Sequence, residues 1–229
     1  MNPDDIRIHT LLVGQPKAVT DEKGTWESAI FRAPVAGPVR LGPRGLESDR
    51  VADTKHHGSP DQAVCCHALA HYAHWNAEFG LEDTSRALGP GAVGENWTLV
   101  GGLEEDVCVG DVYRVGSTAR VQVSGPRFPC WKQERKVGIP GFLKRTMETR
   151  RTGFYVRVLE PGTVAAGDAL TLVERPQPGV SLSRVNVCGL GKLADFDAAE
   201  ARALIAVPEI AAGWRRILEA KLNRDWPDD

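Results

Sequence analysis

Residues 107–132 read VCVGDVYRVGSTARVQVSGPRFPCWK, and this stretch indicates both the fold and the place to look for chemistry. Two short segments in it, Val112–Val115 and Ala119–Ser124, carry β-branched residues and are separated by a break that contains glycine. Short segments of this kind, punctuated by Gly and Pro, are typical of strands in a β-sandwich or barrel. The end of the stretch differs, because a cysteine stands there between a proline and a tryptophan.

The same strand pattern recurs through the first three quarters of the chain. Further strands are expected at Ile6–Val13, Thr25–Phe31, Val39–Leu41, Ala63–Ala68, Asn96–Leu99, Gly153–Val158 and Ala169–Val173. Two helices are expected among them, at His71–Phe79 and Ile139–Thr149. We therefore expect a mainly β fold over residues 1–176, a β-barrel-like domain with a few helices.

Residues 177–229 have a different character. A proline-rich break at Glu174–Gly179 indicates a linker. Asp197 with Glu200 resembles a capping box, and Pro208 suits the first turn of the next helix. A short helix near Ser181–Val187 and an apolar stripe of Ile210, Trp214, Ile217, Leu218 and Leu222 at helical spacing complete the pattern. A small C-terminal three-helix module is therefore expected, whose stripe serves packing and whose outer face is a candidate docking surface.

Composition limits the classes of function. The chain has 229 residues, 42% hydrophobic and 25% charged, which is ordinary for a soluble globular protein. A net charge of −2 gives no overall attraction to nucleic acid or to an anionic membrane. The N-terminal MNPDDIRIHT lacks a signal region, and no apolar stretch approaches the roughly 20 residues of a membrane span. We expect a cytoplasmic protein without direct nucleic acid binding and without membrane association.

The cysteines number five, at positions 65, 66, 108, 130 and 188, with no C-x-x-C pair. An odd count without a signal region favours free thiols, and no spacing fits a zinc site. Cys65 and Cys66 lie in the apolar AVCCHAL, so core packing is expected for at least one of them, and Cys108, between valines, is also expected in the core. Cys188, in the helical tail, has no charged constellation of its own.

Cys130 has different neighbours. Arg127 and Lys132 favour its thiolate form, which ligates metals and attacks electrophiles. Pro126 and Pro129 restrict the loop backbone to few conformations. The alternative is that Cys130 is a small buried hydrophobic residue, which is the common situation of a free cysteine.

Two other loops are rich in polar residues. Residues 47–64 include Asp49, Lys55 and the pair His56 and His57, and a second polar turn follows at 94–99. Neighbouring residues on an extended chain point to opposite faces, so one of the two histidines can face a pocket but a two-histidine metal site is not favoured. A solvated histidine pair remains the alternative.

These segments, in this order, resemble the MOSC domain family, specifically its stand-alone YiiM-like branch. The matching stretches are DRVADTKHHGSPDQAV, HYAHW, GAVGENWTL, GLEEDVCVGDVYRVGSTARVQVSGPRFPCWK, RTGFYVRVLEPGTVAAGD and the helical tail, which together cover nearly the whole chain. The resemblance implies a β-barrel domain that binds a molybdopterin-type molybdenum cofactor, with Cys130 as thiolate ligand to molybdenum. A soft thiolate suits this metal.

The resemblance also implies roles for other residues. Lys55, Arg127 and the turn formed by Gly94, Glu95 and Asn96 are expected to bind the anionic end of the cofactor, because cations and backbone donors suit phosphate. His57 is the candidate proton donor, since its ordinary pKa lies near neutrality. Glu95 is an alternative proton donor. So is Asp111, which is equally suited to capping its own loop.

The activity implied by the resemblance is reduction of N-hydroxylated compounds, such as hydroxylaminopurine bases or amidoxime-like substrates, as a detoxification independent of pyridoxal phosphate. Electrons would come from a separate reductase. The alternative is a sulfur carrier that bears a persulfide on Cys130 for metal-cluster or cofactor assembly, and a third option is a cofactor carrier without turnover. A homodimer is compatible with the sequence, and a labile cofactor can be absent from a heterologous preparation.

Overall fold

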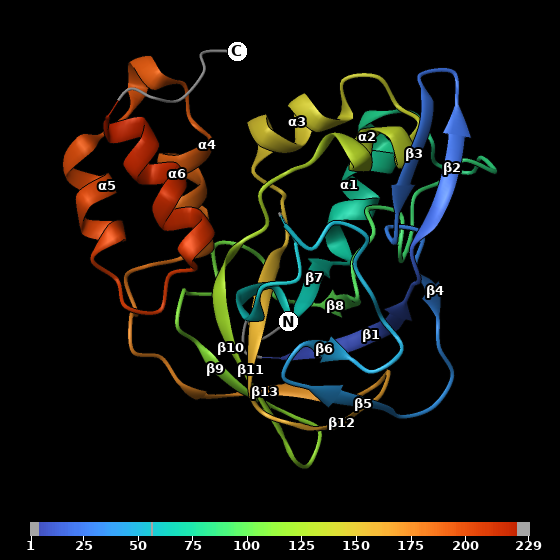
Figure 1. Ribbon diagram of the computed structural model, residues 1–229, viewed down its shortest axis with the longest axis horizontal. Coiled ribbons are helices and arrows are strands. Elements are labelled where there is room, and N and C mark those ends of the chain that lie inside the picture. The colour runs from blue at the N-terminus through green and yellow to red at the C-terminus, as the bar shows by residue number, and fades with distance from the viewer. Residues whose placement is uncertain (1–4, 56, 224–229) are drawn as a thin grey trace.

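A closed β-barrel forms the centre of the computed structural model, which describes residues 5–55 and 57–223 (Figure 1). Its strands are β1 (Ile6–Val13), β7 (Val64–Ala68), β8 (Trp97–Val100), β9 (Val112–Val115), β10 (Ala119–Pro126), β11 (Phe154–Glu160) and β13 (Ala169–Glu174). Within the described residues these seven strands pair in the order β13-β9-β10-β11-β7-β8-β1, and β1 closes the ring on β13. The mainly β, barrel-like fold expected from the sequence is confirmed.

Alternation along the strands fills the barrel. In β10, Ala119, Val121 and Val123 are buried, while Arg120 and Gln122 between them are partly exposed. Successive side chains of a strand point to opposite faces, so one set reaches the interior and the other faces out. The buried set joins one continuous apolar core with the inward residues of the neighbouring strands.

β7 and β8 form the parallel pair of the barrel. Parallel neighbours need a crossover connection, and helix α1 (Ala70–Glu78) provides it, matching the helix expected at 71–79. Every residue of β7 is buried, because α1 covers one face and the barrel interior lies on the other. Tyr72 and Trp75 of α1 form a second small core with Val93 and Phe142.

Two helices follow β10. Helix α2 (Trp131–Val137) was not expected, and α3 (Phe142–Thr149) is shorter than the expected 139–149. α2 begins directly after Cys130 and ends at Gly138, which adopts the left-handed conformation. The turn through Gly141, also left-handed, delays the start of α3.

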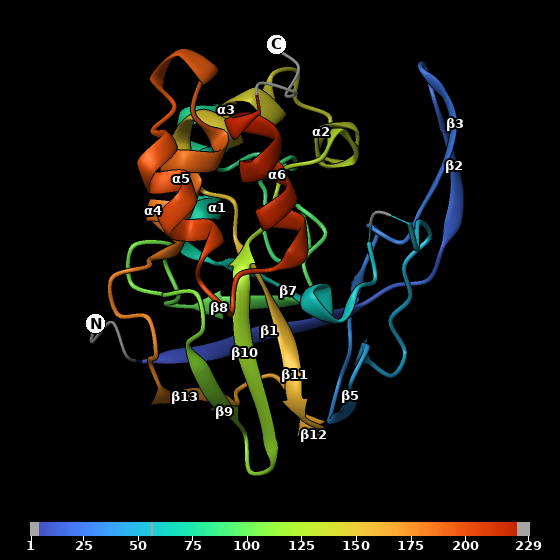
Figure 2. The ribbon, with the colours of Figure 1, turned by 60° about the vertical axis from the view of Figure 1, so that its left-hand side comes forward.

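A hairpin of β2 (Lys17–Asp21) and β3 (Gly24–Ser28) stands away from the barrel, as Figure 2 shows. The strand expected at 25–31 therefore exists in part, and its partner β2 was missed. A second small sheet joins β12 (Gly162–Val164), β5 (Val39–Gly42) and β6 (Gly45–Leu46), β4 (Ala33–Pro34) pairs with β1, and a 3-10 turn η1 (Pro60–Gln62) precedes β7.

The C-terminal helices α4 (Leu182–Leu190), α5 (Ala198–Ile205) and α6 (Ala212–Leu222), with a 3-10 turn η2 (Leu193–Asp195), stack beside the upper end of β10 (Figure 2). Side-chain oxygens of Ser181 and Asp197 cap α4 and α5, as expected for Asp197. Pro208 was placed wrongly in a first helical turn: it lies in a turn after α5, and α6 begins only at Ala212.

These helices share their core with the barrel. Leu182, Leu204, Trp214 and Leu218 are buried and continuous with the barrel interior. The linker before them is tied down by Arg175, whose guanidinium makes paired hydrogen bonds to buried Asp111 at 2.8 and 2.7 Å. The division at residue 176 stays a prediction.

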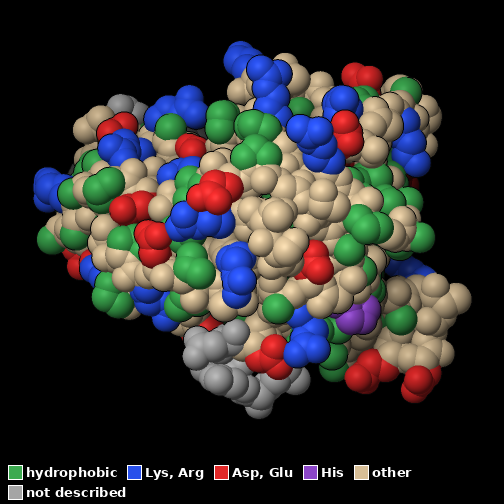
Figure 3. All heavy atoms as spheres, turned by 90° about the horizontal axis from the view of Figure 1, so that it is seen from below, with side chains coloured by type: hydrophobic (Ala, Val, Ile, Leu, Met, Phe, Trp, Pro, Cys, Tyr) green, Lys and Arg blue, Asp and Glu red, His purple; other side chains and the backbone are tan. Residues whose placement is uncertain are grey.

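The surface carries both signs of charge. On the face shown in Figure 3, Lys and Arg side chains are interspersed with Asp and Glu side chains. This mixture fits the net charge of −2. None of the helices within 5–55 and 57–223 is long and apolar enough to cross a membrane.

Candidate functional site

A cavity of about 710 Å³ opens at the barrel wall and is the candidate site. Its lining comes from segments far apart in the chain: the end of β3 and the residues after it, the loops within 40–58, β7, the Gly94–Asn96 turn and the segment 127–132. Of the predicted site residues, His57, Gly94, Asn96, Arg127 and Cys130 line it. The structure thus brings together most of the constellation expected from the sequence.

Lys55 and Glu95 lie elsewhere. Lys55 is exposed and does not line the cavity, so the structure does not place it beside Arg127. Glu95 is fully buried behind the cavity wall. Its Oε1 accepts hydrogen bonds from Tyr72 Oη, Thr98 Oγ1 and the Gly91 amide at 2.6, 2.6 and 2.7 Å. His56 lies outside the described residues.

Arg127 is a buried cation on this cavity. It is 6% exposed, and its Nη1 has no hydrogen-bond partner among the residues that the structure describes. Burial lowers the pKa of Arg127, but nearby Cys65, Tyr155 and Glu95 outweigh that effect, so the pKa is raised and the guanidinium stays charged. A buried guanidinium nitrogen without a hydrogen-bond acceptor is unfavourable, and a bound anion would supply that acceptor.

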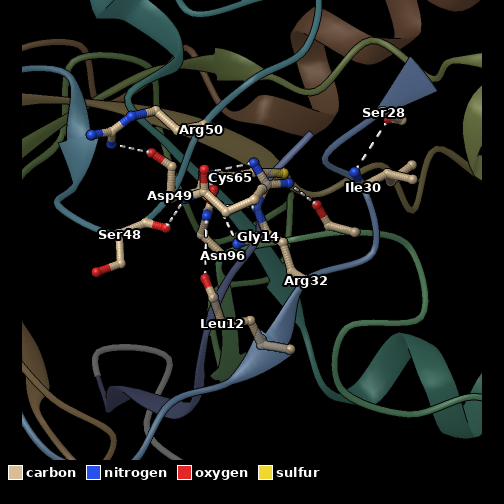
Figure 4. Close-up of polar contacts among 12 residues, drawn as sticks. Leu12, Gly14, Ser28, Ile30, Arg32, Ser48, Asp49, Arg50, Cys65 and Asn96 are labelled. Atoms are coloured by element: carbon tan, nitrogen blue, oxygen red, sulfur yellow. Dashed lines mark hydrogen bonds and ion pairs between the residues drawn. The ribbon is translucent and has the colours of Figure 1, made fainter. Parts of the chain in front are cut away.

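Arg32 was missed by sequence reasoning. Its Nε and Nη2 bind the two oxygens of Asp49, each at 2.8 Å, and its Nη1 donates to the Gly94 carbonyl oxygen at 2.6 Å (Figure 4). Asp49 also accepts from the Gly14 amide at 2.8 Å. This paired geometry fixes the guanidinium plane. Arg32 therefore holds the Gly94 turn in place at the cavity edge.

The Gly94–Asn96 turn forms part of the cavity wall, and its Gly94 and Asn96 amides are not free to bind a ligand. The amides of Gly94 and Asn96 already donate to the carbonyls of Gly91 and Cys65, at 2.9 and 2.8 Å. The Asn96 side chain accepts from the Cys65 amide and donates to the Leu12 carbonyl (Figure 4). Gly94 adopts φ +79°, and a Cβ there would lie 2.2 Å from a side-chain carbon of Ile30, so the turn requires glycine.

Cys130 is half-buried and faces the cavity from the residue that precedes α2. Its amide donates to Gln133 Oε1 at 3.1 Å, which fixes the first turn of the helix. Lys136 anchors that helix by donating to the Ile30 and Gly91 carbonyls. Arg135 anchors it a second time, through Asp21 of the β2–β3 hairpin.

Cys65 also lines the cavity, where the sequence had indicated core packing for at least one of Cys65 and Cys66. It is buried, and burial raises the pKa of its thiol, against the opposing effect of Arg127 and Arg32. Alternation along β7 turns Cys65 inward to the cavity, and no local signal distinguished it from Cys66. Cys66, Cys108 and Cys188 are buried outside the cavity, and core packing was expected for Cys108 and for at least one of Cys65 and Cys66.

Asp111 has the structural role that the sequence allowed for it. It is fully buried and outside the cavity, and its Oδ2 accepts from the Cys108 amide at 2.9 Å and from Tyr113 Oη at 3.2 Å. With the two hydrogen bonds from Arg175, both carboxylate oxygens of Asp111 are hydrogen-bonded. Asp111 therefore caps its loop and holds the linker.

Fold and site together define a β-barrel protein with a cationic, thiol-lined cavity. Residues 53–171 match the MOSC domain family, and the chain belongs to that family. It is 34% identical to YflK of Bacillus subtilis over 99% of both chains. It is 37% identical to a protein named Reductase from Gibberella moniliformis, over 71% of this chain and 28% of that protein. The crystal structure of YiiM from Geobacillus stearothermophilus superposes with a TM-score of 0.77 at 35% identity, covering 95% of this chain and 99% of that one.

MOSC domains are associated with molybdenum cofactor binding. The cavity residues fit such a group: Arg127 Nη1 lacks a partner, Cys130 offers a soft ligand, and the volume is that of a small-molecule site. No cluster of three or more His, Cys, Asp or Glu side chains within 5–55 and 57–223 is grouped to hold a metal ion. A metal here would thus take most of its ligands from a cofactor rather than from the chain.

Proposed function

We propose that the chain binds a molybdopterin-type molybdenum cofactor in the 710 Å³ cavity, with Cys130 as the metal ligand, and reduces N-hydroxylated compounds. The observation that supports this most is the buried, unpartnered Arg127 Nη1 on the same cavity as the Cys130 thiol. Arg127 suits the anionic end of the cofactor. The relative named Reductase supports a redox role.

The overall reaction breaks the N–O bond of the substrate, consumes two electrons and two protons, and yields an amine and water. The cofactor, when bound, supplies the two-electron chemistry. Cys130 would hold the metal, and Arg127 would fix the anionic end. Electrons come from a separate reductase, and hydroxylaminopurine or amidoxime-like compounds are the proposed substrates.

His57 is the proposed proton donor at the cavity, because it is the histidine that lines it among the described residues. Lys55 is exposed and lies outside the lining, so Arg127 is the proposed contact to the anionic end of the cofactor. Glu95 does not itself line the cavity, and its carboxylate supports the neighbouring turn by accepting the Gly91 amide.

The test is made on protein purified from a host that synthesises molybdenum cofactor. Metal analysis and the fluorescence of the oxidised pterin should reveal stoichiometric molybdenum and pterin. Reduced methyl viologen should then drive reduction of a hydroxylaminopurine. Metal without turnover would favour a cofactor carrier, and cyanide-labile sulfur on Cys130 without metal would favour the sulfur carrier. Either result would overturn the proposed reductase.

A further inference from the structure

A second cavity lies beside helix α1. It has a volume of about 560 Å³ and is lined by α1, residues 103–105, residues 149–151 and Ser183 of α4. Five buried titratable side chains lie between this second cavity and the first. We call them the buried row: Glu104, His71, His67, Tyr72 and Glu95, each at most 4% exposed.

The row begins at the second cavity. His71 and Glu104 line it, and His71 Nε2 lies 2.8 Å from Glu104 Oε2. Glu104 Oε1 accepts the Gly153 amide at 2.7 Å. Burial raises the pKa of Glu104, but the His71 bond and the Gly153 amide outweigh it and leave the pKa lowered. Glu104 is therefore a charged acceptor that orients the His71 ring.

His67 occupies the centre of the row. Its ring centroid lies 5.1 Å from that of His71 and 5.3 Å from that of Tyr72, and it stacks on Trp75. Neither ring nitrogen has a hydrogen-bond partner of good geometry within 5–55 and 57–223, and the Thr152 backbone contributes only a weak contact. Burial, aided by His71, lowers the pKa of His67 well below its ordinary value.

A neutral imidazole has one donor and one acceptor nitrogen, so it can accept a proton on one side and release one on the other. A purely structural buried histidine would ordinarily be hydrogen-bonded. His67 instead makes no hydrogen bond of full geometry at either nitrogen, with the Thr152 backbone close by, and it lies between two side chains that are bonded to carboxylates. The rings of His71 and Tyr72 lie on either side of His67, 5.1 and 5.3 Å away between centroids, so a turn of the His67 ring is the movement that a connection would require.

The row ends at the first cavity. Tyr72 Oη donates to Glu95 Oε1 at 2.6 Å, and Glu95 stands between Gly94 and Asn96, which line that cavity. Glu95 Oε2 is buried and has no hydrogen-bond partner in the part of the chain that the structure describes. It is an open acceptor at the end of the row nearest the proposed cofactor.

We propose that the buried row carries protons from the second cavity to the first. The inference rests on the proposed function, because reduction of an N–OH group consumes two protons in a cavity whose own described lining has His57 as its one histidine. A proton enters at His71 and Glu104, and one leaves toward the substrate from Glu95. No electrons pass along the row, and each member returns to its starting form.

The first test needs no cofactor and no turnover. In cofactor-free protein with ¹⁵N-labelled histidine, exchange of the His67 ring proton with solvent is followed by NMR. His71→Gln keeps a donor for Glu104 but cannot relay a proton, so it should slow this exchange several-fold. His74→Gln, on the same helix and the same second cavity but outside the row, should leave it unchanged. Should His71→Gln fail to fold, Glu104→Gln gives the same comparison. Unchanged exchange in the row variants would overturn the relay, whatever the protein reduces.

The second test uses turnover. Tyr72→Phe and Tyr113→Phe each remove a buried hydroxyl that is bonded to a carboxylate, but only Tyr72 belongs to the row. Tyr72→Phe should lower kcat at least about tenfold and raise the solvent deuterium isotope effect, since general acid–base steps contribute that much or more. Tyr113→Phe should change neither. A loss of kcat in Tyr72→Phe with an unchanged isotope effect would show a structural role and refute the relay. Absence of turnover in the unmodified protein would instead refute the proposed function.

Discussion

The indole Nε1 of Trp214 donates a 2.6 Å hydrogen bond to the carbonyl oxygen of Pro126, the residue before Arg127. The backbone of Gly125 and Gly189 packs against the same indole. A Cβ added to either glycine would lie 2.8 or 2.2 Å, respectively, from an atom of the indole. The Phe128 ring packs on it at 5.9 Å between centroids. Helix α6 thereby fixes the backbone that carries the candidate site.

Trp214→Phe should lower the free energy of unfolding by about 1–3 kcal/mol, because the buried Pro126 carbonyl loses its donor. Chemical denaturation measures the change. Trp131→Phe is the control: Trp131 is 47% exposed, and its substitution should shift stability by less than about 0.5 kcal/mol. Equal losses in the two variants would contradict the role given to the Trp214 hydrogen bond.

Arg127→Lys should reduce cofactor content sharply. The guanidinium presents a planar set of donors to a phosphate, whereas an ammonium group does not, so the change is not conservative at a buried anion site. Molybdenum and pterin in purified protein are the measurements. Arg120→Lys, which alters an exposed pair with Glu160 and Glu174, should leave both unchanged. Full cofactor content in Arg127→Lys would remove Arg127 from the proposed site.

Cys130→Ser should abolish reduction of N-hydroxylated compounds while the fold survives, because a hydroxyl is a hard and weakly acidic ligand. Matched variants Cys66→Ser and Cys188→Ser should retain turnover per bound metal, with some loss of stability, since both thiols are buried away from the cavity. Circular dichroism checks the fold. Comparable turnover in Cys130→Ser would exclude Cys130 as the metal ligand.

Acid should loosen the contact between the β2–β3 hairpin and α2. The Arg135 hydrogen bonds lower the pKa of Asp21 from 3.8 to about 2. The folded pKa is below the unfolded one, so the stabilisation is complete above about pH 4 and is lost as the pH falls toward 2. The stability difference between the unmodified protein and Asp21→Asn should therefore shrink across that range. A difference independent of pH would contradict the assignment.

Local sequence patterns predicted the strands well, because the alternation of apolar residues and the preference of β-branched residues for strands are both visible within a few consecutive residues. The same reasoning singled out Cys130 from its prolines and cations, and the structure places it on the cavity. Helix α2 escaped prediction because it is seven residues long and mostly charged, so it has no clear apolar period, and distant anchors from Asp21, Ile30 and Gly91 hold it.

The residues of the candidate site that sequence reasoning missed could not be predicted, because their positions depend on which segments far apart in the sequence lie side by side in the fold. Arg32 reaches the cavity through Asp49 and Gly94, 17 and 62 residues away. Cys65 faces the cavity only because of the register of β7 with its neighbours, which a one-residue slip would reverse. Lys55, which the resemblance assigned to the anionic end of the cofactor, does not line the cavity, and its contact with a cofactor stays a prediction.

The segment bearing Arg127 and Cys130 is held from both ends of the polypeptide, by Asp21 on one side and Trp214 on the other. The barrel itself closes only when Ile6 and Arg7 pair with residues 169 and 170. During synthesis on the ribosome, the cavity therefore stays unfinished until Trp214 of α6 has emerged. A small molecule that binds the completed cavity therefore binds only after the chain through Trp214 has been made.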